Sequence, residues 1–195
     1  MTQTIDELQR FGFKLFFEPD VEIETRAFIP VFHHWIRTHA ISDLLIDVAD
    51  YTHLSDGPSV LLAGHEGNYA IDRSEGRVGL YYYRKQPTTG TLAERLLAVA
   101  RVVISAGILL ENDESVGSVC RFRGDEIQFV ANDRLRAPAT AGTAETLQPL
   151  LATLAKTLFR EKSSGVVTPG PDHRLRMSLG ATDRFPLSSL LDNIS

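Results

Sequence analysis

The sequence has little of what would place it in several large classes of protein. It has one cysteine, Cys120, in 195 residues, so it can form no internal disulfide and no zinc site built from several cysteines. No uncharged apolar run reaches the roughly 18 residues that a membrane-spanning helix needs. The N-terminus is polar and acidic, where a signal peptide would be basic and then apolar. We therefore expect a soluble, cytoplasmic protein with no membrane partner.

Positive charge is scarce as well. The formal net charge is -5, and the lysines and arginines are scattered along the chain. A nucleic-acid-binding protein usually shows a basic stripe that neutralises phosphates, so we expect no nucleic-acid partner. The sequence also lacks a Walker loop, a dinucleotide-binding fingerprint and a Gly-x-Ser-x-Gly nucleophile motif. The sequence therefore gives no motif-based evidence for the reaction classes that depend on these motifs.

The composition is that of an ordinary globular protein. Hydrophobic residues make up 43% of the chain, and a chain of this length can bury one real core. We predict a single domain over residues 1–195. Serine, glycine and proline cluster at residues 163–165 and 169–171, which predicts an exposed linker over residues 162–172, before a last strand and tail.

Hydrophobic periodicity predicts three helices, at residues 26–39, 92–111 and 147–160. Short alternating segments separated by turn residues predict strands between them, and short turns favour antiparallel pairing. One of these turns is expected at Gly124, between strands at residues 120–122 and 127–129. The order of elements predicts an α+β fold, with a mainly antiparallel sheet covered by about three helices in a two-layer sandwich.

The segment from Gly64 to Tyr69 carries the densest group of chemically active side chains. An imidazole and a carboxylate, His65 and Glu66, directly follow an apolar strand, and Asp72 comes shortly after. His65 is a candidate general base that Glu66 or Asp72 could assist. The alternative is a bulged hairpin or loop whose polar residues simply face water.

Three consecutive tyrosines at positions 81–83 form a second feature. Alternation along a strand places Tyr82 on one face of the sheet and the other two on the opposite face. Tyrosines on a sheet face suit ligand stacking or a protein interface, and they also suit ordinary strand packing. The candidate ligand-binding residues are Asn68, Tyr69, Tyr82 and Arg84.

A metal site is a further hypothesis. Asp47, Asp50 and His53 follow one another along a predicted strand and its end, and they could meet His65 across a neighbouring strand. The sequence does not show that these side chains converge, so we assign no metal ligand, and no cofactor can be identified.

The leading hypothesis is a small binding or protein-interaction domain of unknown ligand, with possible self-association or a protein partner, that uses the sheet face and the His65 loop. The alternative is a small hydrolase- or lyase-type enzyme with His65 as base, with or without the assistance of a metal. Both hypotheses expect the substitution His65→Ala to abolish function while leaving the fold intact.

Overall fold

The computed structural model describes residues 5–19, 23–160, 163–169 and 174–195. The strands are β1 (Phe11–Phe17), β2 (Leu45–Asp50), β3 (Pro58–Gly64), β4 (Gly67–Asp72), β5 (Gly79–Arg84), β6 (Phe122–Ala131), β7 (Ser163–Pro169) and β8 (Leu175–Ala181). The α-helices are α1 (Phe28–Thr38), α2 (Leu92–Glu111), α3 (Ala141–Phe159) and α4 (Leu187–Asn193). Short 3-10 helices lie at η1 (Ile5–Glu7), η2 (Thr25–Ala27) and η3 (Ser74–Gly76).

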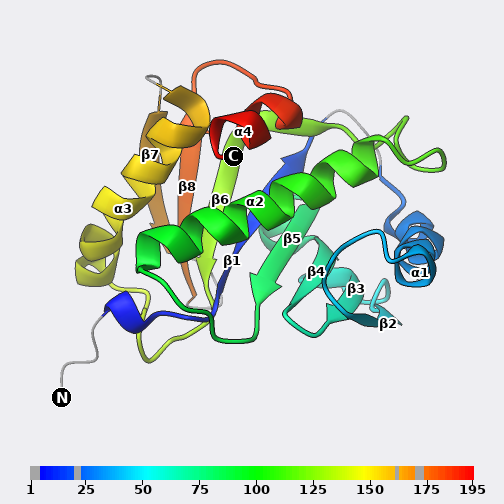
Figure 1. Cartoon of the computed structure of the whole chain (residues 1–195), viewed down its shortest axis with the longest axis horizontal. Coiled ribbons are helices and arrows are strands. Elements are labelled where there is room, and N and C mark those ends of the chain that lie inside the picture. Colours follow the sequence, from blue (N-terminus) through cyan, green and yellow to red (C-terminus); the bar gives the residue numbers. More distant parts are fainter. Residues whose placement is uncertain (1–4, 20–22, 161–162, 170–173) are drawn as a thin grey trace.

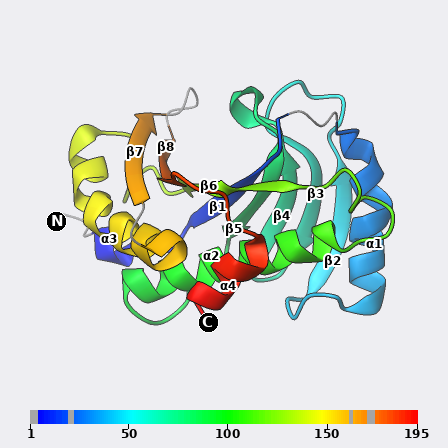
Figure 2. The ribbon, with the colours of Figure 1, turned by 90° about the horizontal axis from the view of Figure 1, so that it is seen from above.

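The eight strands form one sheet in the order β2-β3-β4-β5-β1-β6-β8-β7, and every pairing is antiparallel. Helix α3 packs against β7 and β8, α2 packs against β1 and β5, and α1 packs against β2 (Figure 1). The view along the strands shows α2 and α4 crossing the same side of the sheet (Figure 2). The predicted α+β architecture of an antiparallel sheet covered by helices is confirmed.

Alternation along the strands gives the sheet two different faces. The covered face, beneath the helices, carries the hydrophobic core, which includes Phe13, Leu80 and Phe129. The open face carries the residues that alternate with these core residues along the strands, such as Lys14 and Tyr81. Among the described residues no α-helix packs on the open face.

The helix predicted at residues 26–39 is confirmed as α1. Phe28, Phe32 and Trp35 are buried on its inner side, whereas His33 and Arg37 are exposed. The second helix also begins as predicted, because the side chain of Thr91 accepts a hydrogen bond from the backbone of Glu94 and the Glu94 carboxylate accepts one in return.

The third helix begins earlier than expected, at Ala141 instead of residue 147. Its N-terminus is capped by Thr140, whose hydroxyl accepts a hydrogen bond of 3.3 Å from the backbone N–H of Thr143. Pro138 and Gly142 are residues typical of loops, but a proline before the N-cap and a glycine in the first turn are compatible with a helix start.

Two further expectations are corrected. Residues 163–169 form the edge strand β7, where a linker over 162–172 was expected; the rest of that range lies outside the described residues. Gly124 does not form the turn of a hairpin, because it lies within the continuous strand β6. Its positive φ of 65° accompanies a bulge, since the register against β1 shifts between Leu15 and Phe17.

Candidate functional site

The turn that carries His65 is a compact structural feature of the sheet. His65 is exposed, and its backbone N–H donates a 2.8 Å hydrogen bond to the carbonyl of Leu44. The carboxylate of Asp43 accepts hydrogen bonds from the backbone N–H groups of Glu66 and Gly67, at 3.0 and 3.3 Å. Asp43 therefore occupies the space that the missing side chain of Gly64 leaves, where a Cβ would lie 2.5 Å from its carboxylate oxygen.

The three candidate catalytic residues do not converge. The Glu66 carboxylate accepts a hydrogen bond of 2.6 Å from the guanidinium of Arg84. Asp72 ends strand β4 at the end opposite the His65 turn. Five residue steps of about 3.3 Å place the two ends of β4 roughly 16 Å apart. His65 thus has neither carboxylate as a hydrogen-bonded partner in the part of the chain that the structure describes.

The candidate ligand-binding residues divide between the two faces. Tyr69 and Tyr82 lie on the covered face with ring centroids 4.6 Å apart, and burial raises the pKa of Tyr82 to about 12. They border a helix-side pocket of about 430 Å³, together with Arg84 and Arg101. Asn68 lies on the open face and donates a 2.7 Å hydrogen bond to the hydroxyl of Tyr83.

The residues of the metal hypothesis also stay apart. Asp47 accepts a hydrogen bond from the backbone N–H of Val48, and Asp50 accepts two from Thr52. Over the described ranges, no group of three or more His, Cys, Asp or Glu side chains is placed to hold a metal ion.

A cluster of buried polar side chains crosses the centre of the open face. Lys14, on β1, is 2% exposed, and Asp72 is 5% exposed. The Lys14 ammonium lies 2.6 Å from the Asp72 carboxylate and donates a second hydrogen bond of 3.2 Å to the carbonyl of Ser74. The same carboxylate accepts two hydrogen bonds of 3.0 Å from the backbone and hydroxyl of Ser74. Burial lowers the pKa of Lys14, and the negative charge of Asp72 opposes this shift.

The turn η3 extends this cluster over the next strands. Glu75 has a positive φ of 63°, an uncommon conformation for a residue other than glycine. Its carboxylate accepts a 3.1 Å hydrogen bond from Gln128 on β6 and lies 3.6 Å from the guanidinium of Arg176 on β8. The two acids of the cluster, Asp72 and Glu75, therefore match the charges of its two cations, Lys14 and Arg176.

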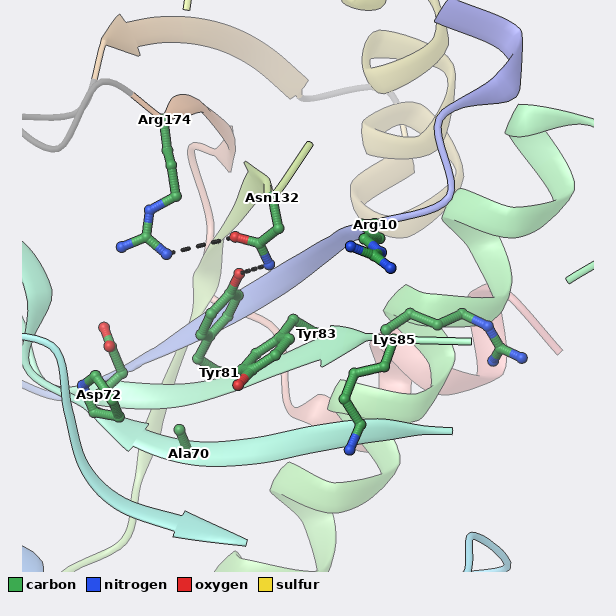
Figure 3. A pocket seen from close by; sticks show the side chains of 10 residues that line it. Arg10, Ala70, Asp72, Tyr81, Tyr83, Lys85, Asn132 and Arg174 are labelled. Atoms are coloured by element: carbon green, nitrogen blue, oxygen red, sulfur yellow. Dashed lines mark hydrogen bonds between the residues drawn. The ribbon is translucent and has the colours of Figure 1, made fainter. Parts of the chain in front are cut away.

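Beside this neutral cluster, the open face is hollowed into a pocket of about 490 Å³. We call it the open-face pocket; its lining residues are Arg10, Pro58, Ala70, Asp72, Tyr81, Tyr83, Arg84, Lys85, Asn132 and Arg174. Figure 3 shows Tyr81 and Tyr83 side by side in its middle, with Arg174 toward one end and Arg10 and Lys85 toward the other. The two tyrosine rings have centroids 5.3 Å apart.

The open-face pocket holds an excess of positive charge. The carboxylate of Asp72 already pairs with Lys14, and the neighbouring carboxylate of Asp133 pairs with Arg136. Within the described chain, the side chains of Arg10 and Lys85 form no hydrogen bond or ion pair with a carboxylate. Together with Arg174, they surround the pocket with cations in a chain whose formal net charge is -5.

Sequence reasoning found only part of this site. The alternation at positions 81–83 placed Tyr81 and Tyr83 on one face of a strand, but it did not indicate that Arg10, Asn132 and Arg174 lie beside them. The clearest missed signal is Lys14, a lone charge in the middle of the otherwise aromatic and aliphatic segment of β1. A charged residue at such a position is buried only when it has a partner.

No helix in the described ranges is both long enough and apolar enough to cross a membrane. Comparisons with known proteins identify no family for the chain: no family model matches it, and no curated protein or solved structure matches it either.

Proposed function

We propose that this protein is a small-molecule binding domain and that its ligand, which carries an anionic group, binds in the open-face pocket. The observation that carries the proposal is the concentration of Arg10, Lys85 and Arg174 around one hollow of an otherwise acidic protein. Arg10 and Lys85 pair with no carboxylate in the described chain, and cations of this kind attract an oxyanion strongly when the site is partly shielded from water.

The shape and the apolar surfaces of the pocket support a ligand larger than a bare ion. A volume of about 490 Å³ lies within the range of pockets that bind small organic molecules. Ala70 and the rings of Tyr81 and Tyr83 offer an apolar and aromatic floor. An anionic group would pair with the cations, while a planar or apolar remainder would lie against this floor.

The alternative of a hydrolase or lyase that uses His65 receives no comparable support. His65 faces solvent, Glu66 pairs with Arg84, and Asp72 lies at the far end of the strand in a bond with Lys14. We therefore propose binding, not catalysis, as the activity, and we propose the open-face pocket in place of the His65 turn as the site.

The proposal predicts that the protein binds phenyl phosphate or benzoate at least about tenfold more tightly than phenol, because only the anions can pair with the cations. Isothermal titration calorimetry at two salt concentrations measures this preference. We expect the affinity for both anions to fall as ionic strength rises. The ratio of the two anion affinities distinguishes a phosphate ligand from a carboxylate ligand.

Charge-reversed variants locate the site. Arg10→Glu and Lys85→Glu should each weaken the binding of phenyl phosphate by about tenfold or more, since each brings a negative charge to the pocket. The matched control is Arg37→Glu, which makes the same change at an exposed position on α1. Equal affinity for phenol and phenyl phosphate, or equal losses in all three variants, would contradict the proposal.

A further inference from the structure

We infer that a hydrogen-bond relay from Arg174 through Asn132 turns the hydroxyl of Tyr81 into a donor for the anionic group of the ligand. This inference rests on the proposed function and names the residues that give the open-face pocket its preference for an acceptor group. It adds a positioning residue, Asn132, to the cations that attract the anion.

The relay begins with a residue that can only donate. The guanidinium of Arg174 donates to the side-chain carbonyl oxygen of Asn132 at 3.4 Å, and a guanidinium has no acceptor atom. The amide oxygen of Asn132 must therefore face Arg174. The NH2 group of the amide therefore points away from Arg174 and toward Tyr81 (Figure 3).

The second bond follows from the first. With its oxygen on Arg174, Asn132 presents its NH2 group to Tyr81 and donates to the phenol oxygen at 2.7 Å. The phenol oxygen is thus an acceptor in this bond, and its own hydrogen is not used in it. In the described part of the chain, no acceptor takes the hydroxyl hydrogen of Tyr81, whose side chain lines the open-face pocket.

The hydroxyl keeps this hydrogen at physiological pH. Burial raises the pKa of Tyr81 well above its ordinary value, so the phenol stays protonated and neutral. A neutral phenol with an engaged oxygen can offer its hydrogen to a carboxylate or phosphate oxygen. A hydrogen bond of this kind, with a charged acceptor, is roughly twice as strong as one between neutral groups.

The arrangement also disfavours ligands that can only donate. The groups that the relay and the cations present to the pocket are donors, namely the Tyr81 hydroxyl and the side chains of Arg10, Lys85 and Arg174. A ligand ammonium placed against them would meet like charge, and the Asp72 carboxylate that also lines the pocket is already bonded to Lys14 and Ser74. The relay therefore selects for an oxyanion by hydrogen-bond direction as well as by charge.

The test is a double-mutant cycle with phenyl phosphate as the probe. Tyr81→Phe removes only the hydroxyl, and we expect it to weaken binding by about tenfold. Asn132→Asp replaces the amide by a carboxylate, which accepts from both Arg174 and Tyr81 and so consumes the Tyr81 hydrogen. In the Asn132→Asp background, Tyr81→Phe should cause no further loss. The effect of the added negative charge is common to both arms of the cycle and cancels.

A second readout does not depend on affinity. The ¹³C resonance of the Tyr81 ring carbon that bears the hydroxyl reports whether the hydroxyl donates, and the Tyr81→Phe spectrum assigns it. Adding phenyl phosphate should shift this resonance in the native protein. In the Asn132→Asp variant it should already be shifted before the probe is added, and it should move little afterwards.

The outcomes separate the two proposals. If the native protein binds no anionic probe, the proposed function fails. If the native protein binds phenyl phosphate but the Tyr81→Phe variant binds it as tightly, the relay is wrong and the proposed function stands. The same conclusion follows if Tyr81→Phe weakens binding equally in the native and Asn132→Asp backgrounds and the ¹³C resonance does not move.

Discussion

The substitution Gly124→Val is expected to lower the free energy of unfolding by about 4 kcal/mol or more, among the largest losses for a single residue. Gly124 has a φ of 65°, which a β-branched residue strongly resists. A Cβ at this position would also lie 1.9 Å from the backbone carbonyl oxygen of Phe185. The Cβ is fixed directly to the backbone of residue 124, and the oxygen belongs to the backbone of Phe185, so the backbone itself would have to move. Chemical denaturation with the native protein as reference measures the loss.

The control for this prediction is Gly57→Val. Gly57 has a φ of 83°, but nothing lies within 4 Å of the position of an added Cβ. It carries the backbone strain without the contact, and we expect a loss of about 1–2 kcal/mol. If the two valine variants were equally stable, the close approach of Phe185 to Gly124 would not be a feature of the folded protein in solution.

The substitution Lys14→Met is expected to destabilise the protein by about 3–5 kcal/mol, because it leaves the buried carboxylate of Asp72 without its cation. Methionine keeps much of the length of the lysine side chain, so the loss reports the charge and not a cavity. The ammonium and the carboxylate are 2.6 Å apart with side-chain exposures of 3% and 7%. Urea denaturation followed by circular dichroism provides the measurement.

The double variant Lys14→Met/Asp72→Asn serves as the control. Asparagine removes the unpaired charge and keeps an oxygen that can accept from Ser74, which bonds Asp72 in the native protein. We expect the double variant to regain more than half of the stability that Lys14→Met loses. A double variant that is less stable than Lys14→Met would show that the ion pair is not what stabilises the centre of the open face.

Local patterns in the sequence were enough to predict much of this fold. The apolar stripe of α1 and the capping box of Thr91 and Glu94 act within one helix, so their signals are complete in a short window. The prediction of a hairpin turn at Gly124 was wrong because the contact that requires a glycine there comes from a distant part of the sequence. Its turn chemistry resembles that of a hairpin, but the reason for glycine there is the approach of Phe185, about 60 residues further along the chain. Strand β7 was missed because serine, glycine and proline are also tolerated on an edge strand.

The site was harder to predict than the fold. The alternation of Tyr81, Tyr82 and Tyr83 across two faces is a local property, but which face stays free of helices depends on where α2 packs. The pocket then draws Arg10, Asn132 and Arg174 from separate parts of the chain. The polar residues of the His65 turn are adjacent in sequence, but Asp43 bonds the backbone of the turn and Arg84 bonds the carboxylate of Glu66.

The most direct test of the central claim is to map the binding of phenyl phosphate by two-dimensional ¹H–¹⁵N NMR. We predict that the backbone amide resonances of Ala70, Tyr81, Tyr83 and Asn132, which line the open-face pocket, shift during the titration, while that of His65 does not. Shifts confined to the helix-side pocket around Tyr82 and Arg101, or shifts of the His65 resonance without those of the open-face pocket, would contradict the account.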